Sequence, residues 1–243
     1  MPGVRHTSIP RLETGIPGFD VLSDGGLPAG RLTVVVGAAG TGKTVLAMQI
    51  ALNAAHRGQG VVYVCFEENP QEGVANLRSF EWQGSVGLET RIRFVASTLA
   101  DDATTASTSN LSELLAAVEA HVKELNAAWV ILDGLDSLLA MLMDPLAERR
   151  EIYRLKRWLQ RTRLGCIVTA KERDDGGLYE IGQIDGLLPF AADCVIRLRA
   201  SAQERTLQRF IRIQKFRGGA SLGGDYPFCI GPGGLSVDCA GLS

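Results

Sequence analysis

The chain has 243 residues, of which 46% are hydrophobic and 21% are charged, a balance typical of a globular protein with a sizeable core. Its 25 Lys and Arg against 27 Asp and Glu give a net charge of −2. The chain therefore lacks the overall basic charge that many nucleic-acid-binding proteins have. No run of about 18 apolar residues occurs and the N-terminus lacks an apolar signal segment, so we expect a cytoplasmic protein without a membrane span.

Strand-like and helix-like segments alternate from Arg31 to about Arg199, which predicts a parallel sheet with helices on both faces. Short apolar runs predict strands at 32–36, 61–66, 92–95, 129–132 and 166–169. Helical patterns follow at 45–56, from 70 onward, at 111–125 and from 145 to about 162, and the second of them begins with an Asn69 N-cap, Pro70 and a capping-box Glu72. The Ser/Thr/Asp-rich segment 97–110 predicts a mobile loop.

Beyond Asp193 the pattern changes to strands at 195–196, 206–216 and 226–230, joined by glycine-rich turns, which predicts antiparallel pairing. We find neither an internal repeat nor an interdomain linker. The sequence therefore predicts a single domain at 11–238, between an N-terminal tail at 1–10 and a C-terminal tail at 239–243.

The most informative segment lies between the first predicted strand and helix, and it matches the pattern G-x-x-x-x-G-K-[ST] at every fixed position. It is Gly37-Ala38-Ala39-Gly40-Thr41-Gly42-Lys43-Thr44. Such a loop turns its amide N–H groups and the following helix N-terminus toward phosphate oxygens. We expect Lys43 to reach the β- and γ-phosphates and the Thr44 hydroxyl to bind Mg²⁺. A glycine-rich turn that matches by chance is disfavoured by the flanking strand and helix.

Acidic residues follow the ends of two predicted strands, at the edge where open α/β sheets bind ligands. Asp133, after the apolar run 130–132, is expected to hold Mg²⁺. For Asp136, a polar turn residue is favoured over a second metal ligand. Glu67 is the candidate general base for water that attacks a γ-phosphate, with Glu68 in support. Two solvated acids ahead of a helix N-terminus are the alternative, and the residues alone do not decide between them.

Further segments resemble the RecA superfamily and, within it, the KaiC branch of ring-forming clock ATPases. They lie at 14–20, 25–31, 66–70, 78–82, 169–173, 215–218 and 226–228, so the resemblance extends over about 11–237. It implies a RecA-like phosphate-loop NTPase of the α/β class, with a mostly parallel central sheet flanked by helices and a C-terminal antiparallel β extension. It also favours Glu67 as the catalytic base.

The resemblance implies a homo-oligomeric ring, a hexamer, with ATP or ADP and Mg²⁺ between neighbouring subunits. Lys215 and Arg217 would then reach the γ-phosphate of the adjacent subunit, and their spacing at a strand end places both side chains on one face. A basic edge strand is the alternative. The implied nucleotide contacts are the loop residues Gly37, Ala38, Ala39, Gly40, Thr41, Gly42, Lys43 and Thr44, together with Val45, Ser79, Asp133, Lys215, Phe216 and Arg217.

Two departures from the family pattern affect the expected activity. Gly231-Pro232 replaces a Thr-Asp pair near the purine, which leaves base selectivity open. Pro189-Phe190 replaces the Ser-Thr pair of the self-phosphorylating half, so we expect an ATPase without autokinase activity.

The expected role is signalling to regulatory partner proteins. The alternatives are a recombinase-like DNA-binding ATPase and a nucleotide-gated scaffold with negligible hydrolysis. The cations of the predicted helix at 145–162 could form a nucleic-acid patch, but a solvated or subunit-facing helix is favoured at this net charge.

Overall fold

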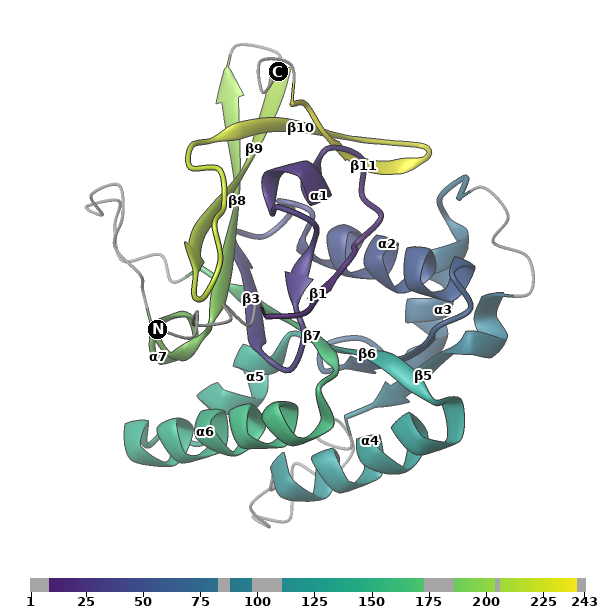
Figure 1. Ribbon diagram of the computed structural model, residues 1–243, viewed down its shortest axis with the longest axis vertical. Coiled ribbons are helices and arrows are strands. Elements are labelled where there is room, and N and C mark those ends of the chain that lie inside the picture. The colour runs from purple at the N-terminus through teal and green to yellow at the C-terminus, as the bar shows by residue number, and fades with distance from the viewer. Residues whose placement is uncertain (1–8, 83–87, 98–110, 173–185, 204–205, 240–243) are drawn as a thin grey trace, which may run out of the picture.

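The computed structural model describes residues 9–82, 88–97, 111–172, 186–203 and 206–239. In this part of the chain a nine-stranded sheet has the order β11-β10-β9-β8-β3-β7-β6-β4-β5 (Figure 1). Its strands are β3 Leu32–Gly37, β4 Gly60–Cys65, β5 Ile92–Ala96, β6 Ala127–Asp133, β7 Gly165–Lys171, β8 Cys194–Gln203, β9 Thr206–Phe216, β10 Tyr226–Gly231 and β11 Gly234–Val237. A separate antiparallel pair joins β1 Arg11–Leu12 to β2 Leu27–Pro28.

Helices cover both faces of this sheet (Figure 1). On one face lie α1 Phe19–Leu22, α2 Lys43–His56 and α3 Pro70–Arg78, and on the other lie α4 Leu111–Leu125, α5 Leu135–Ala140 and α6 Pro145–Thr162. The shorter α7 Leu187–Ala191 precedes β8, and a 3₁₀ turn at Leu88–Arg91 precedes β5. The predicted α/β class with a mostly parallel sheet is confirmed.

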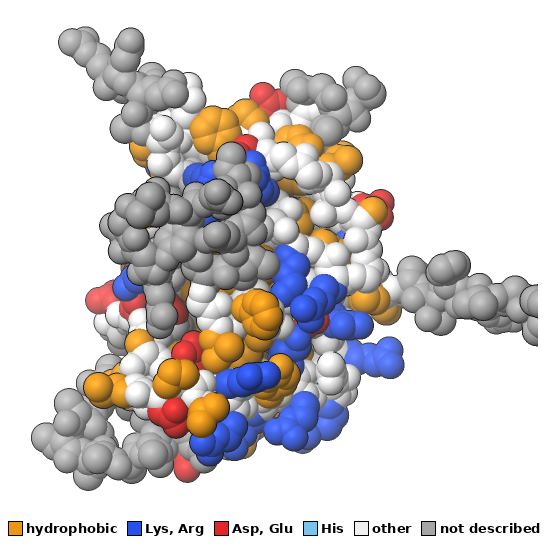
Figure 2. Space-filling view, turned by 90° about the vertical axis from the view of Figure 1, so that its left-hand side faces the viewer, with side chains coloured by type: hydrophobic (Ala, Val, Ile, Leu, Met, Phe, Trp, Pro, Cys, Tyr) orange, Lys and Arg blue, Asp and Glu red, His pale blue; other side chains and the backbone are white. Residues whose placement is uncertain are grey.

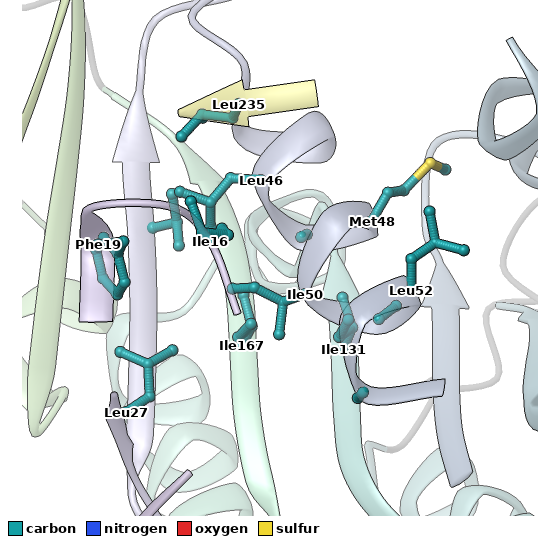
Figure 3. Close-up of a cluster of buried hydrophobic side chains, with 14 of the residues drawn as sticks. Ile16, Phe19, Leu27, Leu46, Met48, Ile50, Leu52, Ile131, Ile167 and Leu235 are labelled. Atoms are coloured by element: carbon teal, nitrogen blue, oxygen red, sulfur yellow. The ribbon is translucent and has the colours of Figure 1, made fainter. Parts of the chain in front are cut away.

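A separate hydrophobic core fills the space on each side of the sheet. In the first core, Leu46 and Ile50 of α2 point toward the sheet, where Ile131 and Ile167 face them (Figure 3). Each is fully buried, and burying such a side chain contributes about 1.5–3 kcal/mol. This packing fixes α2, and with it the loop at its N-terminus, against the strand ends.

The predicted helix starts are confirmed by their caps. The Asn69 side chain accepts a hydrogen bond from the Glu72 backbone N–H at 2.9 Å, and the Glu72 carboxylate accepts one from the Asn69 N–H at 3.2 Å. At the start of α6, the Asp144 carboxylate accepts from the Leu146 N–H at 2.9 Å. Each cap satisfies amides that the first helical turn leaves unpaired.

The C-terminal part differs from the expected arrangement at β8. This strand pairs in parallel with β3 and in antiparallel fashion with β9, so the change of direction falls between β8 and β9. The strand β11 was not expected, because its residues follow the glycine-rich turn Gly231-Pro232-Gly233-Gly234. The predicted loop at 97–110 lies, from residue 98 on, outside the described residues. No helix of the described part is long and apolar enough to cross a bilayer.

Candidate functional site

The carboxyl ends of four adjacent strands meet at one edge of the sheet. Across β3, β7, β6 and β4, the paired positions are Gly37 with Lys171, Thr169 with Asp133, and Asp133 with Cys65. A pocket of about 210 Å³ opens at this edge. Predicted site residues that line it are Ala39, Gly40, Lys43, Thr44, Glu67, Glu68 and Asp133, so the structure brings the phosphate loop and the acids together.

At two glycines of the phosphate loop a side chain would clash with a neighbouring strand. Gly42 has a φ of 103°, and a Cβ there would lie 2.6 Å from the Ile230 side chain. At Gly37 a Cβ would lie 2.6 Å from the Leu198 carbonyl oxygen. Gly42 is also the N-cap of α2, and no side chain of the described residues caps this helix start. Its first amides are therefore available to an anion.

The Lys43 ammonium folds back onto the phosphate loop. It donates to the Gly37 and Ala38 carbonyl oxygens, each at 2.9 Å. Burial is the largest influence on this group and lowers its pKa, while Asp136 and Asp133 oppose the shift. A phosphate that entered the pocket would offer the ammonium a charged acceptor in place of two carbonyl groups.

Asp133 is held by three hydroxyl groups at the end of β6. Tyr63 donates to its Oδ2 at 2.7 Å, Thr169 donates to Oδ1, and the Thr44 hydroxyl lies 3.5 Å from Oδ1. The fully buried Tyr63 has a pKa well above its usual value, because burial and the Asp133 charge both disfavour a phenolate. Thr44 and Asp133 thus place two hard oxygen donors side by side. This donor set fits Mg²⁺, which takes one or two protein oxygens together with substrate phosphates.

The two glutamates after β4 have different surroundings. Glu67 Oε1 accepts a hydrogen bond from the Ser137 hydroxyl at 2.7 Å. The same oxygen forms an ion pair with the Lys171 ammonium at 2.6 Å. Both contacts lower the pKa of Glu67, and the contact with Lys171 has the larger effect. Glu68 instead accepts from Asn76 of α3 at 2.8 Å. Glu67 is therefore held against the strand ends, while Glu68 is directed toward the neighbouring helix.

Asp136 lies in the first turn of α5, not in an irregular turn. Its Oδ2 accepts a hydrogen bond from the Lys171 backbone N–H at 3.0 Å, and this bond links α5 to the end of β7. Burial raises the pKa of this carboxyl. The expected polar turn residue is therefore a helical residue that lines the pocket, and its contact with β7 gives it a structural part in holding α5.

Lys215, Phe216 and Arg217 lie away from the pocket of their own chain. The register of the sheet gives the separation along the strands. Lys215 of β9 pairs with Val195 of β8. Gly37 of β3 pairs with Leu198, which lies three residues further along β8. Three residues correspond to about 10 Å along a strand, and β9 is also two strands from β3.

Local contacts hold these three residues where they are. The Lys215 ammonium donates to the Phe190 carbonyl oxygen at 2.6 Å. The Phe216 ring lies 4.3 Å from the Arg11 guanidinium carbon, and the Arg217 N–H donates to the Asp193 carbonyl oxygen at 2.8 Å. Burial, first, and then the Arg217 cation lower the pKa of Lys215.

Other predicted contacts are also absent from the residues that line the pocket: the loop residues Gly37, Ala38, Thr41 and Gly42, and outside the loop Ser79 and Val45. Ser79 is exposed at the C-terminal end of α3, where its hydroxyl donates to the Asn76 carbonyl oxygen at 2.7 Å. Val45 is half-buried and packs on the first core. The Pro232 carbonyl oxygen accepts the Glu81 N–H at 2.8 Å, so the β10–β11 turn contacts the segment that follows Ser79.

Sequence reasoning missed four polar residues of this site: Tyr63, Ser137, Thr169 and Lys171. Two of them carried a usable signal. Tyr63 is a polar group within an apolar strand, and a buried tyrosine hydroxyl usually finds a partner. Lys171 lies two residues beyond the predicted end of a strand, at the edge where ligands bind.

The basic helix α6 has acidic neighbours. Figure 2 shows Lys and Arg side chains gathered in the lower half of one face, at the height that α6 has in Figure 1. Its ion pairs are Arg154 with Glu151, Lys156 with Asp193 and Arg161 with Glu119. This pairing favours a structural role for these three cations.

Comparison with known proteins points to one family. A model of the KaiC ATPase family matches residues 12–240. The chain is 37% identical over 225 residues to the circadian clock protein KaiC3 of Synechocystis sp., covering 91% of this chain and 44% of that protein. It is 32% identical over 232 residues to the circadian clock oscillator protein KaiC of Parathermosynechococcus lividus, covering 94% of this chain and 42% of that protein. The chain thus spans less than half the length of these relatives.

Proposed function

The chain belongs to the KaiC ATPase family, and from this premise we propose that it binds ATP with Mg²⁺ at the strand-end pocket and hydrolyses it. The observation that carries the proposal is the convergence of Lys43, Asp133 and Glu67 on one pocket beside an uncapped helix N-terminus. Each has the chemistry that hydrolysis needs: a cation for phosphate, a carboxylate for the metal and a base for water.

In the proposed reaction the loop amides and Lys43 hold the phosphates. Thr44 and Asp133 would hold Mg²⁺, which would supply positive charge to neutralise the phosphates. Glu67 accepts a proton from water as the water oxygen bonds to the γ-phosphorus. The bond between the γ-phosphorus and the bridging oxygen breaks, and ADP and phosphate leave. Tyr63 and Thr169 keep the Asp133 carboxylate oriented throughout.

The proposed site is completed by a neighbouring subunit in a ring, a hexamer. Supporting this is the register of the sheet, which separates Lys215 of β9, and Arg217 just after it, from the phosphate loop of their own chain. Reaching a γ-phosphate would therefore require a second copy. Such a cation stabilises the charge that develops during phosphoryl transfer.

Regulatory signalling to partner proteins is the proposed use of the cycle, because the matched relatives are named as circadian clock proteins. Autokinase activity is not proposed, because Pro189 and Phe190 have no hydroxyl groups at the position where the self-phosphorylating half carries a Ser-Thr pair.

The test is to measure phosphate release from ATP with and without Mg²⁺, and particle mass with ATP, with ADP and without nucleotide. Magnesium-dependent release from a nucleotide-dependent ring is the expected result. A ring that binds ATP without releasing phosphate would favour the scaffold alternative. Tight binding of single-stranded DNA with a steep salt dependence would favour the recombinase-like alternative.

A further inference from the structure

A second cation, Lys171, shares the pocket with Lys43. It ends β7 directly beside Gly37, the first residue of the phosphate loop. Its ammonium lies 2.6 Å from Glu67 Oε1, and the two side chains are 58% and 41% exposed. Both line the pocket, so an ion pair crosses the space where a γ-phosphate would be attacked.

The backbone of Lys171 is fixed but its side chain can move. Pairing with β3 and the bond from its N–H to Asp136 hold the main chain. The ammonium is at the end of a flexible stem and is mostly in solvent, so rotating it away from Glu67 costs little. Glu67 would still keep its hydrogen bond from Ser137 after such a rotation.

We propose that Lys171 is a second phosphate-binding residue, whose ammonium leaves Glu67 for an oxygen of the γ-phosphate when ATP enters the pocket. The proposal rests on the proposed function. Lys171 keeps its three hydrogens throughout, and the proton of the attacking water still passes to Glu67. The exchange links the two roles, because the carboxylate loses its cation when the γ-phosphate arrives.

Charge explains why the exchange needs ATP. The terminal phosphate carries more negative charge than a single carboxylate, so it is the stronger partner for a compact ammonium. An ion-paired carboxylate is a weak proton acceptor, as the lowered pKa of Glu67 indicates. ADP has no γ-phosphate, so it would leave the pair between Lys171 and Glu67 intact.

The test compares ATP and ADP affinity in a Glu67→Gln background. In this background we expect ATP turnover to be slowed by about 100-fold or more, so binding can be measured before ATP is consumed, and no carboxylate at this position repels the nucleotide. Into this background we would introduce Lys171→Met, which removes the charge, and Lys171→Arg, which retains it. Lys123→Met is the matched control, because Lys123 is also an exposed lysine that pairs with a glutamate, on α4.

The expected result is that Lys171→Met lowers ATP affinity by about tenfold or more, the scale of one hydrogen bond to a charged group. ADP affinity should change by less than about twofold. With Lys171→Arg or Lys123→Met, the ratio of ATP affinity to ADP affinity should stay near that of the Glu67→Gln background. Equal losses for both nucleotides, or no loss, would overturn the inference and leave Lys171 as a residue that only holds Glu67. A background chain that binds neither nucleotide would overturn the proposed function itself.

Discussion

The Tyr63 hydroxyl, in β4, donates a hydrogen bond to Asp133 Oδ2 at 2.7 Å. Asp133 ends β6, which pairs with β4 in the sheet. The tyrosine is fully buried, so this bond orients the carboxylate from the interior of the protein. Thr169 makes a second bond, from the strand on the other side of β6. The carboxylate is therefore held from both flanking strands before any ligand binds.

We expect Tyr63→Phe to weaken Mg²⁺ binding without removing the ligand. The ring still fills its place in the core, but Asp133 loses one of the bonds that orient it. Groups that orient metal ligands typically contribute about 10- to 100-fold in metal affinity or activity. The Mg²⁺ concentration for half-maximal hydrolysis should rise by about tenfold or more, and Tyr153→Phe on the exposed face of α6 is the control. An unchanged Mg²⁺ requirement would contradict the orienting role.

Lys43→Ala should abolish ATP binding while the chain stays folded. The substitution removes the cation of the loop, and within the described part of the chain the ammonium hydrogen-bonds to loop carbonyl groups. Binding can be measured by calorimetry and folding by circular dichroism. Full ATP affinity in this variant would show that the loop is not the nucleotide site.

The sequence predicts the parts of the site that one strand end can carry, and it misses those that depend on pairing between strands. The phosphate loop, Asp133 and Glu67 each follow a recognisable apolar strand. That Tyr63 lies near Asp133 depends on the register between β4 and β6, which tertiary packing sets. The role of Lys171 does not follow from the sequence, because the predicted strand ends at residue 169, before the position that pairs with Gly37.

Glu67→Gln should leave ATP bound but slow hydrolysis by about 100-fold or more, the usual scale of general-base assistance. The amide is nearly isosteric and can still accept a hydrogen bond from Ser137. Single-turnover phosphate release measures the effect, with Glu68→Gln as the matched variant. If the Glu68 variant is the slower of the two, the base is assigned to the wrong glutamate.

Removing the Lys171 charge should shift the acid limb of kcat/KM to higher pH. The base must be deprotonated, and the ion pair holds the pKa of Glu67 below its usual value in the free enzyme. In Lys171→Met the pKa rises, so activity is lost at a higher pH as the solution is acidified. The charged groups that remain around Glu67 are Lys43, Glu68, Asp133 and Asp136.

The same substitution should affect kcat differently. The acid limb of kcat reports the complex with ATP, where Lys171 has already left Glu67, so it should move little. Rates are compared only over the pH range in which both proteins remain folded by circular dichroism. Equal shifts in both profiles would indicate that the pair persists in the ATP complex.

Mixing two inactive variants should restore activity if Lys215 and Arg217 act on a neighbouring subunit. Arg217→Ala chains lack the cation but keep Glu67, and Glu67→Gln chains have the opposite defect. In mixed rings some interfaces join an intact Glu67 to an intact Arg217, and a cation of this kind can contribute about 10³-fold or more in rate. If both residues acted within one chain, every site in the mixture would stay defective.

Subunits must exchange before the comparison is made, so the variants are mixed without nucleotide and ATP is added afterwards. A labelled subunit confirms exchange, and Arg212→Ala mixed with Glu67→Gln is the control, because Arg212 of β9 pairs with Asp225 of its own chain. Arg212→Ala chains should be active before mixing, since their arginine has a local partner. Confirmed exchange without any recovery of activity in the Arg217 mixture would refute the assignment to a neighbouring subunit.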